Sequence, residues 1–365
     1  MKKIGILTIH NAINYGAVLQ AYALEFTLEK IGYEVEIINY IGTYNNDTNY
    51  KKGNLKKRLK KIFWHNKYRL HDYKCKKFDN FMQNYYQLSS KKYNKTSIKK
   101  IESQYDYFVT GSDQIWNLEI TKQDTTFMLD FVSDSSKKIS YAASFGYEKI
   151  PEKYVEITGK YLGLYASLLV REKSGVALLK NAYNLLAKFV LDPTLLLDEY
   201  GWKQLISDRL IKDKYIVIYT VACQKNLIEV AKKYAKENDC QIYFIRLEPQ
   251  KEKDLSIHPI YDAGPKEFLS YIKYADCVFT TSFHGFAFAV NFNVNVYYEA
   301  DKELNNNTGR LTDLAYELGV SYRCISQDYF TDDNKKIIDW NVVNQKLNRL
   351  RLASVNELNK ALGGK

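Results

Sequence analysis

Short apolar segments alternate with helix-forming segments along most of this chain, and the alternation limits the folds that the chain can adopt. Residues 3–9 have the composition of a buried strand, residues 16–31 are rich in Ala and Leu and predict a helix, and residues 34–40 again resemble a strand. Two strands joined by one helix usually lie parallel to each other in one sheet. The start of the chain therefore predicts an α/β fold built on a parallel sheet.

The alternation continues in two successive halves, and a chain of 365 residues is long enough for two domains with separate cores. We predict two Rossmann-like, doubly wound domains that face each other across a cleft, with the boundary near residues 192–198. The expected parts are an N-terminal domain at 1–195 with a basic insertion at about 45–100, a C-terminal domain at 196–340, and a C-terminal helix at 341–365 that packs back on the N-terminal domain.

Composition and cysteine spacing indicate a globular protein of the reducing cytosol. Hydrophobic residues make up 46% of the chain and charged residues 26%. The five cysteines lie far apart and form no C-x-x-C pair, which argues against a structural zinc site or a disulfide framework. The apolar run at 4–9 is too short for a signal peptide, and no run is long enough to span a bilayer. We expect a soluble cytoplasmic protein.

The net charge of +11 is concentrated in one segment. Residues 51–100 carry 17 Lys and Arg against two Asp, so the rest of the chain is slightly acidic. Apolar residues between 55 and 64 recur among lysines, as in a basic amphipathic helix. This pattern fits a helical insertion that packs on its own domain. It also fits peripheral contact with the inner membrane face or with a lipid-diphosphate-linked substrate. No sequence pattern of a nucleic-acid-binding module supports a nucleic acid partner.

His284 is the first candidate for a catalytic residue. It lies where the expected strand at 275–279 gives way to a small, apolar helical segment that begins at Gly285. In an open parallel sheet this is the carboxyl edge, where ligands bind, and the amino end of a helix attracts anions. An imidazole there can give or take a proton near neutral pH. The alternative is a histidine that caps the helix or fills a gap in the packing.

Polar residues also follow two earlier strands. Asn11 and Asn14 come after the first strand, and Gly111, Ser112 and Asp113 follow the strand at 105–110. The asparagines are candidates for a sugar or phosphate site, and Asp113 is a candidate base or hydroxyl-binding group. Both Asn14 and Asp113 could instead be ordinary helix N-caps. Because the chain has neither a G-x-G-x-x-G motif nor a phosphate-binding G-x-x-x-x-G-K-[ST] motif, we predict neither NAD nor ATP.

Several segments, taken together and in order, resemble the polysaccharide pyruvyl transferase family, and the resemblance covers nearly the whole chain, from about residue 3 to residue 319. They are the segments at 14–20 (NYGAVLQ), 111–116 (GSDQIW), 142–146 (AASFG), 170–174 (VREKS), 191–195 (LDPTL) and 282–285 (SFHG). No single segment is specific, but the ordered set is. The resemblance implies two Rossmann-like domains arranged as in GT-B glycosyltransferases. It also implies phosphoenolpyruvate as the donor and a pair of glycan hydroxyls as the acceptor, giving a pyruvate ketal and phosphate.

The resemblance also implies roles for individual residues. Arg171 resembles a donor-binding arginine, and an arginine suits both the carboxylate and the phosphate of the donor. Arg310, in the first turn of an expected helix, could reach the phosphate, although it could equally be a surface arginine. His284 is the expected proton donor and acceptor, and Asp113 would position or deprotonate the acceptor. Gly111 and Ser112 are further substrate-binding candidates. No step needs a redox cofactor, and no metal ligands cluster in the sequence.

One position departs from the family. Many members carry an arginine two residues before the histidine, whereas this chain has Ser282. The donor carboxylate could then be bound by Ser282, Thr281 and helix N–H groups. The donor could also be different, or the activity could be lost.

Three functions remain open from the sequence. The leading one is a pyruvyl transferase acting on a capsular or cell-wall glycan precursor, with the basic segment bringing it to lipid-linked acceptors. The second is a glycosyltransferase that uses a nucleotide sugar in the same cleft. The third is a non-catalytic glycan- or lipid-binding scaffold. The enzymatic readings require that His284 and Arg171 share one cleft.

Overall fold

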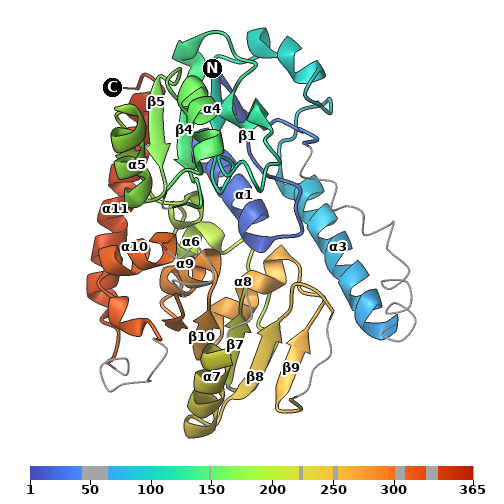
Figure 1. Ribbon diagram of the computed structural model, residues 1–365. Coiled ribbons are helices and arrows are strands. Elements are labelled where there is room, and N and C mark those ends of the chain that lie inside the picture. Colours follow the sequence, from blue (N-terminus) through green and yellow to red (C-terminus); the bar gives the residue numbers. More distant parts are fainter. Residues whose placement is uncertain are drawn as a thin grey trace.

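The computed structural model describes residues 1–42, 65–147, 149–221, 225–249, 254–300, 309–325 and 336–364. In these ranges the chain forms two α/β domains, one above the other in Figure 1, each with a sheet of parallel strands between helices. The prediction of two Rossmann-like domains in a GT-B-like arrangement is confirmed. Most expected strands and helices are present, with ends that differ from the predicted ones by a few residues at most.

The N-terminal sheet has six parallel strands. Their order across the sheet is β2 (Glu34–Ile37), β1 (Lys3–Leu7), β3 (Tyr107–Thr110), β4 (Lys138–Ala143), β5 (Ser167–Val170) and β6 (Lys188–Phe189). The helices that accompany it are α1 (Tyr15–Lys30), α4 (Glu152–Leu162) and α5 (Lys173–Tyr183). Strands such as β4 are buried at every position, because helices cover both faces of a parallel sheet. All carboxyl ends therefore lie along one edge of this sheet.

The C-terminal sheet has five parallel strands. Their order is β11 (Asn295–Tyr298), β10 (Cys277–Thr280), β7 (Tyr215–Tyr219), β8 (Gln241–Ile245) and β9 (Ile257–Ile260). Its helices are α7 (Lys225–Glu237), α8 (Pro265–Lys273), α9 (Phe283–Asn291) and α10 (Gly309–Leu318), and the short α6 (Glu199–Trp202) precedes it. The sequence analysis did not predict β9. This strand contains Pro259, which removes a backbone donor and is tolerated because β9 lies at the sheet edge.

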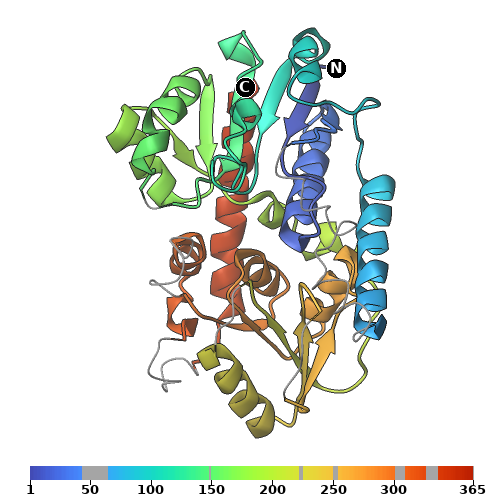
Figure 2. The same cartoon turned by 45° about the vertical axis from the view of Figure 1, so that its right-hand side comes forward.

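The final helix, α11 (Trp340–Ala361), runs along both domains, as the long red helix in Figure 2 shows. In the N-terminal domain, the Ser354 hydroxyl accepts a hydrogen bond from the Leu191 N–H at 2.9 Å. At the domain junction, the Arg351 guanidinium donates to the Leu195 carbonyl and to the Asn291 side chain of α9. The helix therefore fixes the segment that connects the two domains.

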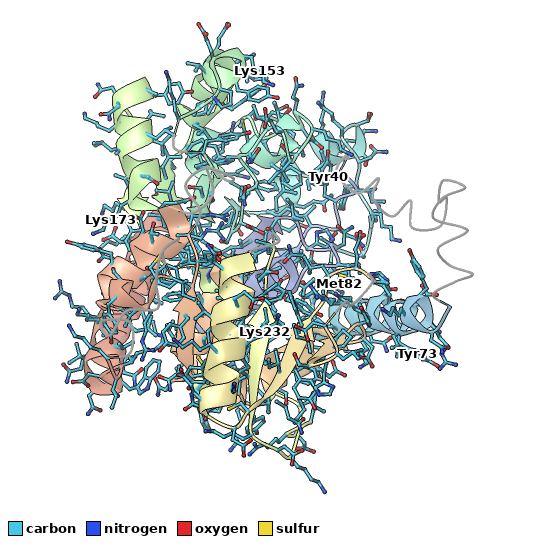
Figure 3. All side chains as sticks on the ribbon, turned by 60° about the horizontal axis from the view of Figure 1, so that its bottom comes forward. Tyr40, Tyr73, Met82, Lys153, Lys173 and Lys232 are labelled. Carbon is cyan, nitrogen blue, oxygen red and sulfur yellow. The ribbon has the colours of Figure 1, made fainter. Side chains whose placement is uncertain are left out.

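Helix α3 (His65–Tyr85) comes from the N-terminal domain and extends along the side of the C-terminal domain (Figure 1). Lys77 forms an ion pair with Glu267 of α8, at 2.9 Å. The exposed face of α3 includes Tyr73, labelled in Figure 3, together with both positive and negative charges. Residues 55–64, which predicted a basic amphipathic helix, lie outside the described part of the chain.

The hydrophobic core is continuous between the domains. One cluster of buried side chains includes Ile4 and Leu24 of the N-terminal domain together with Val217 and Phe288 of the C-terminal domain. Among the described helices, none is both long and apolar enough to cross a membrane.

Candidate active site

Charged residues from both domains meet at the junction. Asp113 follows β3, Arg171 follows β5, and Asp192 follows β6, so the N-terminal domain contributes them along the carboxyl edge of its sheet. The C-terminal domain contributes His284 in the first turn of α9 and Arg310 in the first turn of α10. A cluster of five ionisable groups from two domains is the arrangement expected of an active site in a two-domain α/β protein.

Asp192 lies at the centre of the cluster, and its side chain is fully buried. Its Oδ2 atom accepts hydrogen bonds from the Ser112 hydroxyl at 2.8 Å and from Arg171 Nη1 at 2.9 Å. Its Oδ1 atom accepts from the backbone N–H and the hydroxyl of Thr194, at 3.0 and 2.7 Å. Burial raises the pKa of the Asp192 carboxyl, but His284, Arg171 and the Thr194 N–H outweigh burial and lower the pKa below its usual range. Asp192 is therefore a carboxylate.

Arg171 lies between two carboxylates. Its Nη1 atom donates to Asp192, and its Nη2 atom donates to Asp113 Oδ1 at 3.2 Å. Its guanidinium also lies over the ring of Phe283, with 4.9 Å between Cζ and the ring centroid. Burial lowers the pKa of Arg171, and the two aspartates raise it by more. The guanidinium is thus a buried, fixed cation whose orientation is determined by two anions.

Asp113 has a left-handed backbone with φ of 72°, which directs its side chain toward the other charges. Arg310 Nη1 lies 3.8 Å from the same Oδ1 atom that Arg171 contacts. Burial raises the pKa of Asp113, but the opposing effect of Arg171, His284 and Arg310 is larger, so the pKa lies below its ordinary value. The Asp113 side chain is therefore part of the charge cluster, and it caps no helix in the described structure.

His284 is placed by the start of α9. The Ser282 hydroxyl accepts a hydrogen bond from the Gly285 N–H at 3.4 Å, so Ser282 is the N-cap of this helix. The side chain of His284 is almost entirely buried, and its Nε2 atom lies 3.7 Å from Asp192 Oδ1. On the other side of the ring, Nδ1 faces Gly16 of α1 so closely that a Cβ atom on Gly16 would lie 2.0 Å from it. The imidazole is therefore enclosed between the two domains.

Glu172 is a second buried carboxyl group beside the cluster. Its Oε1 atom accepts a hydrogen bond from the Ser144 hydroxyl, whereas Oε2 has no hydrogen-bond partner among the described residues. Burial raises the pKa of Glu172 above its ordinary value, although Arg171 and Arg310 oppose the rise. The pKa of Glu172 is thus shifted upward, whereas those of Asp192 and Asp113 are shifted downward.

A small cavity opens beside these groups. It is lined by Arg171, Asp192 and Arg310 and by an apolar wall formed by Phe189, Leu191, Leu195, Phe283 and Leu314. Burial and the neighbouring Arg171 lower the pKa of Arg310 to about 10. Two guanidinium groups next to an apolar wall can bind a small anion that also has an apolar part.

Several predicted residues lie apart from this cluster. Asn14 is the N-cap of α1 and accepts from the Ala17 N–H at 3.2 Å. Thr281 accepts from the Val221 N–H at 3.1 Å, at the end of β7 in the C-terminal domain. Asn11 is half-buried in the loop before α1. Gly111 packs so closely on the Tyr141 carbonyl that it has no room for a side chain. Their binding roles stay predictions.

The sequence analysis did not include Asp192, Glu172 or Gly16 among the site residues. Asp192 appeared there only in the segment 191–195 that resembles the family and at the expected domain boundary near residues 192–198. The signal that could have found it was available, since Asp192 comes shortly after β6, a strand of the same parallel sheet as those that precede Asp113 and Arg171. Within the described ranges, no group of three or more His, Cys, Asp and Glu residues is arranged to hold a metal ion.

Comparison with solved structures identifies proteins of similar fold. The structure of S. aureus MnaA in complex with UDP aligns with this chain with a TM-score of 0.55 and 12% sequence identity. The alignment covers 100% of this chain and 97% of the MnaA chain. A UDP-GlcNAc 2-epimerase from Methanocaldococcus jannaschii aligns with a TM-score of 0.53 and 15% sequence identity, and the alignment covers 98% of this chain and 93% of the epimerase chain. A putative UDP-N-acetylglucosamine 2-epimerase from Listeria monocytogenes aligns with a TM-score of 0.51 and 11% sequence identity, and the alignment covers 98% of this chain and 90% of the epimerase chain. At these identities the similarity shows the fold alone.

Comparison of sequences identifies the family. No curated protein matches the chain. The family model of the polysaccharide pyruvyl transferases matches residues 14–300, which include every residue of the charge cluster except Arg310. Because this match extends over well more than half of the chain, the protein belongs to the polysaccharide pyruvyl transferase family.

Proposed function

We propose that this protein transfers the enolpyruvyl group of phosphoenolpyruvate to two hydroxyls of a capsular or cell-wall glycan precursor, forming a pyruvate ketal and releasing phosphate. The observation that carries the proposal is the buried cluster at the domain junction, where two guanidinium groups and Asp192 line a small cavity and the imidazole of His284 lies 3.7 Å from the same aspartate. The donor has a carboxylate and a phosphate, and arginine binds both groups through its planar donors.

The proposed reaction needs one group that both gives and takes a proton. His284 as imidazolium donates a proton to the methylene carbon of the donor, which leaves an oxocarbenium-like centre at C2. The first sugar hydroxyl attacks C2 and returns its proton to His284. The second hydroxyl attacks C2 as the bond to phosphate breaks, and its proton leaves with the phosphate. General acid–base help of this type contributes about 10²–10⁴-fold.

The donor would enter a site in which Arg171 is already paired with two carboxylates. An anionic donor therefore has to compete with Asp113 for Arg171 and Arg310, since Asp113 contacts both guanidinium groups. Asp113, once displaced, is placed to accept a hydrogen bond from a sugar hydroxyl. Ser282 is held by its capping bond to Gly285, so it adds a neutral hydroxyl, not a cation, to this side of the site.

We further propose that the acceptor is lipid-linked and that the basic segment brings the protein to the inner membrane face. The stretch 51–64, in which apolar residues recur among lysines, is assigned this contact. The exposed face of α3 suits it less well, because Arg69 and Lys76 are accompanied there by Asp72 and Asp79.

Phosphate release from phosphoenolpyruvate with a panel of lipid-linked sugars tests the proposal, with His284→Ala beside the unchanged protein. His258→Ala is the control, since His258 is exposed on the edge strand β9. We expect acceptor-dependent release that falls at least about 10²-fold in His284→Ala and is unchanged in His258→Ala.

Two other outcomes would replace the proposal. If no acceptor supports release but a nucleotide sugar raises the melting temperature, the protein is a glycosyltransferase. If neither is observed and the protein still binds lipid-linked glycans, it is a non-catalytic scaffold.

A further inference from the structure

Asp192 is surrounded by donors on both of its oxygen atoms. The Thr194 N–H points at Oδ1, and Arg171 Nη1 points at Oδ2. Neither donor can act as an acceptor. If an amide replaced the carboxylate, its NH₂ group would face either the Thr194 N–H or Arg171 Nη1, and neither can accept a hydrogen bond from it. The site accepts a carboxylate at this position and no neutral substitute of the same shape.

The segment that carries Asp192 is held in place from three directions. The Thr194 carbonyl accepts from Trp202 Nε1 at 3.1 Å and from Asn291 Nδ2 at 3.2 Å. The Leu195 carbonyl accepts from Arg351 Nε at 2.6 Å. These donors come from α6, α9 and α11, so the carboxylate has a fixed position relative to the helix that carries His284.

The two nitrogens of His284 have different surroundings. Nε2 is buried, lies 3.7 Å from Asp192 Oδ1, and has no hydrogen bond to any described residue. Nδ1 lies against Gly16 of α1, and the ring occupies the space that a side chain at Gly16 would take. An anion beside Nε2 favours a hydrogen on that atom, which leaves the lone pair of the neutral ring on Nδ1.

We propose that Asp192 is a positioning residue that keeps the hydrogen of neutral His284 on Nε2, so that Nδ1 is the nitrogen that exchanges protons with substrates. The assignment of Nδ1 to proton exchange rests on the proposed function. In that reaction the imidazolium gives its Nδ1 proton to the methylene carbon, and Nδ1 takes the proton of the first hydroxyl. Asp192 keeps its own charge throughout and touches no reacting atom.

Other charged groups also face the imidazole. Asp113 comes from the end of β3, Arg171 from the end of β5, and Arg310 from α10. Among these groups, Asp192 is the one whose carboxylate lies nearest to Nε2 in the described structure. A change at Asp192 should therefore alter the tautomer, whereas a change that preserves its carboxylate should not.

The test is the ¹⁵N spectrum of the full chain with labelled histidine, recorded without substrate at a pH high enough to keep the ring neutral. The chain has five histidines, and His284→Gln assigns the signal of interest. In the unchanged protein we expect the form with hydrogen on Nε2 to exceed the other form by at least about tenfold, because a buried carboxylate 3.7 Å away attracts an N–H dipole and repels a lone pair. In Asp192→Asn this ratio should fall at least about threefold.

Thr194→Val is the matched control. It deletes a hydroxyl that donates to the same Oδ1 atom, keeps the side-chain shape and leaves the carboxylate in place. We expect the tautomer ratio to stay as in the unchanged protein. A ratio that falls equally in both variants would mean that general loosening of the segment, and not the charge of Asp192, determines the tautomer, and the proposal would be wrong.

The unchanged protein alone can also refute the proposal, should Asp192→Asn fail to fold. A main form with hydrogen on Nδ1 would overturn it directly. Because the spectrum requires no substrate, its result is independent of whether the protein releases phosphate from phosphoenolpyruvate. Failure of the transferase assay with the expected spectrum would remove the proposed reaction and leave the Asp192–His284 pair standing.

Discussion

Among the contacts between the domains in the described part of the chain, two differ clearly in chemistry. The first, here called the charged junction, is formed by Asp113, Arg171, Asp192, His284 and Arg310. The second, here called the aromatic junction, is formed by Tyr15 of α1, Lys74 and Lys77 of α3, and Glu267 and Phe268 of α8. The two are adjacent along the chain, since Tyr15 precedes the Gly16 that touches His284.

The aromatic junction is mostly ring packing. Tyr15 stacks on Phe268 with ring centroids 4.2 Å apart, and its hydroxyl donates to the Ala263 carbonyl at 2.8 Å. Lys74 is fully buried with its Nζ 4.9 Å from the Tyr15 ring centroid, and it donates to the carbonyls of Arg246 and Leu247 at 3.2 and 3.3 Å. An anionic substrate offers no replacement for these contacts.

The charged junction is different because the ion pairs that Asp113 forms with Arg171 and Arg310 could be replaced by contacts with a substrate anion. Lys173 and Glu317 extend it at the surface, where α5 meets α10, near the label of Lys173 in Figure 3. We therefore expect the contacts of the aromatic junction to persist and to hold the domains together when a substrate anion replaces ion pairs in the charged junction. Four predictions test this division, beginning with the largest expected effect.

The first prediction concerns Gly16, where the two junctions meet. In Gly16→Ala the added methyl group would lie 2.0 Å from His284 Nδ1, so the imidazole has to move. We expect activity to fall by about 10²-fold, the lower end of what acid–base catalysis contributes, with little loss of melting temperature. Gly175→Ala is the control, because a Cβ there meets its neighbours at 3.7 Å, an ordinary contact. Equal activities of the two variants would contradict the role of Gly16.

The second prediction concerns Lys74. Lys74→Met removes the donor to two backbone carbonyls, and we expect a loss of about 1–3 kcal/mol in the free energy of unfolding. Urea unfolding measures this loss. Activity per folded molecule should be unchanged, since the aromatic junction does not exchange partners. A large loss of activity in fully folded Lys74→Met would break the division between the junctions.

The third prediction uses the pKa of Lys74. Burial lowers that pKa to about 8, below the ordinary value of the unfolded chain. Between pH 8 and the unfolded value, the unfolded state binds more protons than the folded state, so stability from this group rises with pH. The difference in unfolding free energy between the unchanged protein and Lys74→Met should therefore shift in favour of the unchanged protein from pH 7.5 to about 10. A constant difference would show that the buried amine does not titrate in this range.

The fourth prediction compares two ion pairs that cross between the domains. Lys77→Ala removes the pair with Glu267 in the aromatic junction, and Lys173→Ala removes the pair with Glu317 beside the charged junction. Both lysines are at least one-third exposed, so we expect losses of only about 0.2–1 kcal/mol, smaller still at high salt. Thermal unfolding at two salt concentrations measures them. A loss above this range in either variant would indicate that the pair acts cooperatively with the buried part of its junction.

Much of the fold and part of the site could be predicted from the sequence. The strand and helix pattern predicted two doubly wound domains because periodicity and turn residues are local properties. The carboxyl-edge rule selected Asp113 and His284, and the family resemblance selected Arg171; the structure brings all three to one cluster. The same rule also selected Asn14, whose amide is used by the first turn of α1, because a cap and a ligand-binding residue look alike in sequence.

The sequence by itself determined which residues stand at the ends of parallel strands, since each strand and the turn after it are encoded by neighbouring residues. Tertiary structure decided which of those ends face each other. Asp192 became the centre of the cluster because β5 and β6 are neighbours and because α9 of the other domain begins opposite them. Gly16 acquired its importance in the same way, from the approach of an imidazole 268 residues later in the chain. Contacts between distant segments depend on how the two domains pack, and no local pattern of residues specifies that packing.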